Sequence, residues 1–145
     1  MSYLENSSFE SYQLQQGWVR VNLPEAVQLV YVGGGIAKTG SWVMELRSSV
    51  PGGSMGQDVV VQAPSVSCFA WLRAKNAMAE GTLALWRLNT GHVSTAEFRV
   101  STTWTLITNT LDLRFAGRLD PQSIRVEFYL NSVDDSLYID SANLF

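Results

Sequence analysis

Two carboxylates that face each other across a cleft can hydrolyse a glycosidic bond, and several acidic residues lie in or near strand-like segments. The candidates are Asp58, Glu97, Glu127 and the neighbours Asp134 and Asp135. Adjacent residues of a strand point to opposite faces, so Asp134 and Asp135 cannot face each other. Their surroundings favour a solvated turn. No other pair stands out by its spacing, so we do not expect a glycosidase or a lyase.

Nucleophilic and zinc chemistry lack the residues that they need. The single histidine, His92, follows Asn89-Thr90-Gly91 in an expected hairpin turn, and the single cysteine, Cys68, lies in an apolar run. The sequence has no G-x-S-x-G elbow. One histidine and one cysteine do not make a zinc site. We therefore expect an exposed His92, a buried and inert Cys68, and no enzymatic activity.

Aromatic side chains offer a different chemistry, because the apolar face of a pyranose can stack on a flat ring while polar groups bind its hydroxyls. The chain has 5 Trp, 5 Tyr and 6 Phe. Tryptophan is also a large core residue, and the surrounding pattern favours the core for Trp42, Trp71 and Trp104. Trp18 follows a polar stretch and Trp86 lies in a mixed strand, so these two are candidates for sugar contacts.

The elements that must position these residues are short β-type runs separated by turn residues. They cover 26–32, 42–46, 57–62, 67–74, 82–88, 95–100, 104–113, 123–131 and 137–145, whereas 74–80 is a loop or a single turn. The alternation is clearest where Ile124, Val126 and Phe128 share one face and Arg125 and Tyr129 the other. Such spacing predicts an all-β fold, either a sandwich or a barrel.

Composition limits the class of protein. The 145 residues are 46% hydrophobic and 16% charged, with a formal net charge of −3. This balance excludes disorder, predicts one module over 1–145 and gives no basic surplus for nucleic acid. No segment is apolar enough for a membrane span. The first ten residues, MSYLENSSFE, show no leader, and the chain ends with its last strand, so we expect a part of a longer secreted or surface protein.

A series of short motifs runs through the chain in a recognisable order. They are Asn6-Ser7-Ser8-Phe9-Glu10, Trp18, Gly40-Ser41 before a strand that ends at Arg47, Gln57, Ala70-Trp71-Leu72-Arg73-Ala74, Thr103-Trp104 and Leu137-Tyr138-Ile139-Asp140. In this order the chain resembles the carbohydrate-binding modules of families four, nine and twenty-two, which are jelly rolls of the galactose-binding-domain-like type. The resemblance implies a β-sandwich jelly roll of two antiparallel sheets. It also implies a non-catalytic module that docks a parent enzyme or surface protein onto a polysaccharide or glycan.

The resemblance also implies a structural calcium ion between the N-terminal segment and the last strand. Glu10 and Asp140 match the carboxylate positions, and carbonyls near Lys38 and Ser41 would complete the shell of oxygens that calcium prefers. The residues themselves agree, because Asp140 interrupts an apolar run and an inward carboxylate needs a partner. A turn-capping or surface role for Asp140 is the alternative.

Members of these families bind sugar in a cleft across the concave sheet or at the loop edge. The candidate contacts are Trp18, Arg47, Gln57, Trp86, Tyr129 and Asn131. The loop after Arg47 lacks the tryptophan of the xylan-binding type, which argues against xylan. The alternative function is a structural or adhesion domain, as in phage tails or surface layers, with protein partners and no sugar site.

Overall fold

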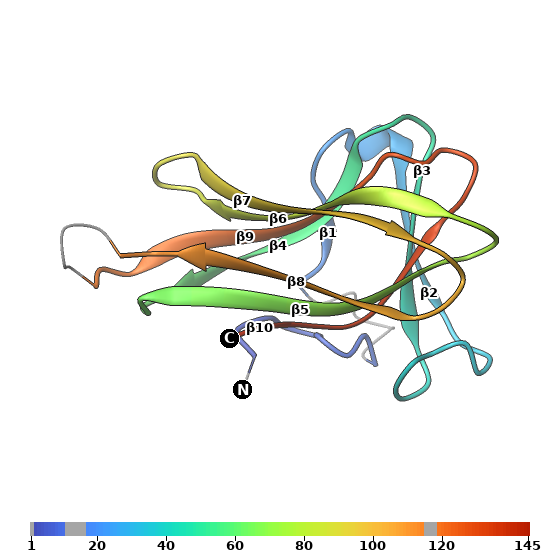
Figure 1. Ribbon diagram of the computed structural model, residues 1–145, viewed down its shortest axis with the longest axis horizontal. Helices are drawn as coiled ribbons and strands as arrows, with labels where there is room; N and C mark the ends of the chain where they lie inside the picture. Colours follow the sequence, from blue (N-terminus) through green and yellow to red (C-terminus); the bar gives the residue numbers. More distant parts are fainter. Residues whose placement is uncertain (1, 11–16, 115–118) are drawn as a thin grey trace.

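Two antiparallel sheets lie face to face in the computed structural model, which describes residues 2–10, 17–114 and 119–145 (Figure 1). Sheet A has the order β1 (Val19–Arg20), β4 (Gly53–Val61), β9 (Gln122–Leu130), β6 (Ala79–Arg87) and β7 (His92–Val100). Sheet B has the order β2 (Val27–Val32), β3 (Val43–Ser48), β10 (Leu137–Leu144), β5 (Ser65–Ala74) and β8 (Thr105–Asp112). This confirms the predicted β-sandwich jelly roll.

All nine strands expected from the sequence are present, with their ends shifted by a few residues. The sequence pattern missed β1, which has two residues, and the 3-10 turn at Pro24–Ala26. The segment between β5 and β6 is a loop, as expected. Among the residues described, no helix is long and apolar enough to cross a membrane.

The core lies between the sheets and is built from alternate residues of each strand. In β5 the inward residues are Val66, Cys68, Ala70, Leu72 and Ala74, each at most 1% exposed. The same alternation holds in β9, where the apolar residues point inward. The prediction of a buried Cys68 is confirmed, and His92 is exposed as expected.

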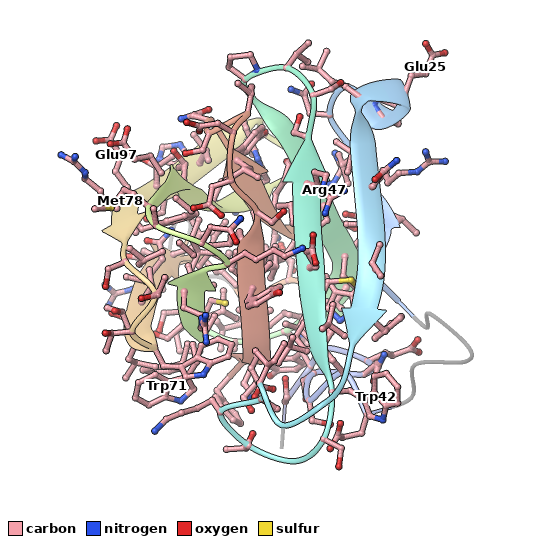
Figure 2. The ribbon with its side chains drawn as sticks, turned by 90° about the vertical axis from the view of Figure 1, so that its right-hand side faces the viewer. Glu25, Trp42, Arg47, Trp71, Met78 and Glu97 are labelled. Carbon is pink, nitrogen blue, oxygen red and sulfur yellow. The ribbon has the colours of Figure 1, made fainter. Side chains whose placement is uncertain are left out.

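Three tryptophans predicted to be core residues are not in it. Trp71 has the opposite parity to Cys68 and Leu72, so its ring is half-buried on the outer face of sheet B and points away from the strands (Figure 2). Trp104 is also half-buried, and its indole donates to the Ile36 carbonyl. Trp42 is half-buried at the start of β3, where its ring lies against the backbone of Gly33. Strand parity explains the position of Trp71, whereas Trp42 and Trp104 lie just before the first residues of β3 and β8.

Candidate ligand-binding faces and metal centre

Three of the six predicted sugar contacts lie together on the outer face of sheet A. The strand register places Tyr129 of β9 beside Thr82 of β6, and Trp86 of β6 beside Arg125 of β9. Asn131 follows β9 directly and is exposed. Because residues two apart on a strand share a face, Trp86, Tyr129 and Asn131 point to the same side.

Tyr129 is held by a buried carboxylate on the same face. Glu127 is only 2% exposed, and its carboxylate accepts a short hydrogen bond from the Ser54 hydroxyl. Burial, together with the hydrogen bond that the phenol donates to Glu127, raises the pKa of Tyr129 to about 12. The phenol is thus a neutral donor engaged with Glu127, and the ring is fixed in place.

The Trp86 indole N–H is buried and makes no hydrogen bond of normal geometry with any described residue. It lies close enough to the Tyr129 hydroxyl to lower the pKa of that group slightly against the larger effect of burial. A buried donor without an acceptor costs about 1 to 3 kcal/mol.

The remainder of this face consists of polar side chains and of small residues that leave part of the sheet surface uncovered. Arg125 donates to both carboxylate oxygens of Asp58, at 2.7 and 3.0 Å. Gly56 and Ala84 lie on either side of Glu127 in the strand register. Because these residues are small, the surface between the larger side chains is depressed there. A shallow hollow of ≈ 430 Å³ lies at the end of the face near Asn131, with Thr82, Glu97 and Arg99 in its lining.

The other three predicted contacts lie elsewhere, which corrects the expectation of a single site. Arg47 is exposed on the outer face of sheet B, where it pairs with Glu45 at 2.8 Å. Gln57 is 4% exposed and faces inward, bonded in both directions to the backbone of Glu5. Because position 57 points into the core, the Gln57 amide lies on neither outer face.

Trp18 is a core residue at 2% exposure. Its ring packs on Phe9 and Phe128, with centroids 5.5 and 6.1 Å away, and its indole donates to the Asn6 carbonyl. An edge of the residue borders a hollow of ≈ 710 Å³ between β1 and β2. A ring packed in this way cannot serve as a stacking platform for a sugar.

Asp135 also departs from expectation, since it is 7% exposed rather than solvated like Asp134. Its carboxylate accepts backbone N–H groups of the β5–β6 loop, from Ala77 at 2.7 Å and from Asn76 and Met78 at 3.0 Å, and a fourth from Ser136. Burial alone would raise the pKa of Asp135, but these four donors outweigh it and lower the pKa.

The candidate metal ligands are brought together around the loop that leads into β3. Glu10 accepts the backbone N–H groups of Ser41 at 2.6 Å and Trp42 at 2.9 Å. Asp140, from β10, accepts the N–H of Thr39 at 2.8 Å. Three distant segments of the chain therefore meet at this loop.

The chemistry of this site suits a hard cation. Asp140 is 0% exposed, and burial raises its pKa, with a smaller contribution from the nearby Glu10 carboxylate. Hydrogen bonds from the backbone N–H groups of Thr39, Ser141 and Lys38 act in the opposite direction and lower this pKa. No third acidic, histidine or cysteine side chain joins the pair among the described residues, so hydroxyls and backbone carbonyls, including those of Lys38 and Ser41, would have to supply the remaining oxygens.

Sheet B carries a group of aromatic and cationic side chains that the sequence analysis did not single out. Lys38 lies over the Trp71 ring, with Nζ 4.7 Å from the centroid. Arg73 lies over both Trp104 and Tyr138, with Cζ 5.9 and 5.3 Å from their centroids. The signal available in the sequence was the alternation of Phe69, Trp71 and Arg73 with small or aliphatic residues in β5.

Comparison with known proteins supports the fold. No protein-family model matches the chain, and no curated protein matches it. Among solved structures, the carbohydrate-binding module TmCBM61, in complex with β-1,4-galactotriose, is 18% identical with a TM-score of 0.69, covering 100% of this chain and 98% of that one. The CBM22-1 xylan-binding domain of Xyn10C from Paenibacillus barcinonensis is 13% identical with a TM-score of 0.66, covering 89% and 85%.

The fold is not confined to binding modules. The Stig cyclase Fisc from Fischerella sp. TAU, in complex with an indole compound, is 12% identical with a TM-score of 0.75, covering 99% of this chain and 95% of that one. At such identities the similarity concerns the fold. The chain thus has the jelly-roll fold of carbohydrate-binding modules, as its motifs predicted.

Proposed function

We propose that this chain is a non-catalytic glycan-binding module whose neutral sugar ligand lies across the outer face of sheet A. The observation that carries the proposal is the pair of half-buried rings, Trp86 and Tyr129, whose polar groups lie close together on this face. An aromatic pair flanked by hydrogen-bonding side chains suits a sugar, which offers an apolar C–H face and hydroxyls.

The polar groups of the face favour binding over catalysis. Asp58 is engaged by Arg125, and Glu127 by Ser54 and Tyr129. Neither carboxylate is free to act as acid or nucleophile, whereas both networks can exchange hydrogen bonds with hydroxyls. A module of this kind would hold a parent enzyme or surface protein near a polysaccharide.

Affinity electrophoresis on neutral polysaccharides, with β-1,4-galactan and xylan in the panel, tests the proposal. Trp86→Ala should weaken binding at least about tenfold, the factor that 1.4 kcal/mol gives. Trp86→Phe keeps a ring but loses the N–H and should be intermediate. Trp71→Ala removes the same ring from the opposite sheet and should leave neutral-glycan binding unchanged.

If no polysaccharide retards the wild-type protein, or if Trp71→Ala weakens retardation as much as Trp86→Ala, the proposed site is wrong. Absence of any retardation would favour the alternative of a structural or adhesion domain with protein partners. The three tryptophan variants must first match the far-UV circular dichroism spectrum of the folded wild type, so that loss of fold is not read as loss of binding.

We further propose that Glu10 and Asp140 hold a structural calcium ion with oxygens of the loop at Lys38 and Ser41. The donor set supports this, because two carboxylates and neighbouring carbonyls suit calcium. Gly40 has φ +68°, and a Cβ there would lie 1.9 Å from a Glu10 carboxylate oxygen. The ion would join the N-terminal segment to the last strand.

Thermal unfolding with calcium and with EDTA tests this site. A ligand that binds only the folded state raises Tm with its concentration, so calcium should raise Tm of the wild type. Asp140→Asn and Gly40→Ala should abolish that rise, whereas Asp134→Asn, an exposed control, should keep it. A wild-type Tm that is the same in calcium and in EDTA would remove the metal from the proposal.

A further inference from the structure

The outer face of sheet B presents cations that are seated on aromatic rings. We call it the Trp71–Arg73 face; its members are Lys38, Phe69, Trp71, Arg73, Trp104 and Tyr138. The cation-to-centroid distances of 4.7 to 5.9 Å are those of cation–π contacts. Figure 2 shows the Trp71 ring pointing away from the strands.

Lys38 and Arg73 form no ion pair within residues 2–10, 17–114 and 119–145. Arg73 donates to the main-chain carbonyls of Ala74 and Lys75. Two carboxylates share the outer face of sheet B in the strand register, Glu45 beside Tyr138 and Asp140 beside Trp71. Glu45 is paired with Arg47 and Lys75, and Asp140 accepts the backbone N–H of Thr39. The Trp71–Arg73 face therefore holds two cations that these carboxylates do not engage.

We propose that the Trp71–Arg73 face is a second glycan site, which binds an acidic polysaccharide through its uronate carboxylates. The planar guanidinium of Arg73 can donate two parallel hydrogen bonds to one carboxylate. Lys38, from the loop between β2 and β3, supplies a second charge over the Trp71 ring. Phe69, 38% exposed, and the open part of Trp71 offer apolar surface to the C–H face of the sugar.

The rings also prepare the cations for binding. A free lysine or arginine loses side-chain entropy when it is immobilised in an interface. Lys38 and Arg73 are already placed by Trp71, Trp104 and Tyr138, so part of that loss has occurred before the ligand arrives. Two fixed charges are fewer than the roughly six to ten phosphate contacts made by proteins that bind DNA tightly.

The experiment compares polygalacturonate with methyl-esterified polygalacturonate, in which the same backbone has lost its charge. The wild type should bind the acidic polymer at least about tenfold more tightly, because esterification removes the charge-assisted hydrogen bonds to the carboxylates. Arg73→Gln and Lys38→Gln should each remove most of this preference, and added salt should weaken it. Arg99→Gln, which removes the same charge from sheet A, should not.

Three results would overturn the proposal: equal affinity for the esterified polymer, equal loss in the Arg99→Gln control, or equal binding of single-stranded DNA at the same charge concentration. The proposal is separable from the sheet A site. Trp86→Ala should leave polygalacturonate binding intact, so either site can fail while the other stands.

Discussion

At the scale of single residues, burial sets the reactivity of Cys68. Removal from water disfavours the thiolate and raises the pKa of this thiol to about 12. Since the thiolate is the reactive form, a thiol reagent such as DTNB should not react with the native protein at pH 8. It should react fully and promptly in denaturant. Rapid labelling of the folded protein would show that β5 opens or that Cys68 is not buried.

The carboxylate of Asp135 makes stability depend on pH. Its folded pKa is lowered, because four backbone donors outweigh burial. The unfolded chain therefore takes up the proton first, and the stabilisation is complete above the unfolded pKa of about 3.9 and is lost as pH falls through the folded value. Asp135→Asn should cost about 1 to 3 kcal/mol at pH 7, and clearly less near pH 2.5.

Urea unfolding at the two pH values measures this difference. Asp134→Asn is the matched control, because the neighbouring side chain is exposed and should change stability by less than about 0.5 kcal/mol. A penalty for Asp135→Asn that is the same at both pH values would contradict the role of its charge.

Whether a side chain points into the core was predictable where only one face of a strand is apolar. It was not predictable where both faces of the strand are apolar. In β9 the charged and apolar sets separate cleanly, so the inward face was correctly predicted. In β5 the run Cys68-Phe69-Ala70-Trp71-Leu72 is apolar at every position. The small residues Cys68 and Ala70 fill the narrow space between the sheets, and the rings of Phe69 and Trp71 lie outside.

At the scale of elements, Asn109 links the two sheets along one edge of the sandwich. Its amide lies in β8 of sheet B and donates to the carbonyls of Leu83, at 3.0 Å, and Ser94, at 2.7 Å, in sheet A. It also accepts from the Ser94 hydroxyl at 2.8 Å. Asn109→Leu should leave these groups unpaired and lower the free energy of unfolding by about 2 to 3 kcal/mol.

Urea unfolding measures this loss, and Thr108→Ala, an exposed neighbour in the same strand, should change stability by less than about 0.5 kcal/mol. Equal effects of the two substitutions would mean that the edge is held by apolar packing alone.

The strands themselves followed from short-range patterns, but their assignment to sheets did not. A strand's alternation reveals its two faces and says nothing about which sheet it joins. Arg47 and Tyr129 both lie on polar faces, yet β3 belongs to sheet B and β9 to sheet A. The six sugar contacts inferred from the resemblance therefore divide among two outer faces and the core. β1 was missed because two residues carry no periodicity.

At the scale of the whole molecule, the two outer faces differ in chemistry although they share one core. Sheet A presents the Trp86 and Tyr129 rings with the Asp58–Arg125 ion pair, whereas sheet B presents Lys38 and Arg73 over aromatic rings and the ion pairs of Glu45. The chain ends lie side by side at β10, where Tyr3 donates to the Leu144 carbonyl (Figure 1). Since the core separates the faces, a ligand on one sheet cannot touch a ligand on the other.

Binding of a neutral and an acidic glycan should therefore be independent. Saturation with a neutral oligosaccharide should leave the dissociation constant of polygalacturonate within about twofold, because the coupling free energy between rigid, separate sites is near zero. Isothermal titration of each ligand in the presence of the other measures this. Competition would place both ligands on one face, and the charge-removing variants would then identify it: loss of both with Arg73→Gln points to sheet B, and loss of both with Trp86→Ala to sheet A.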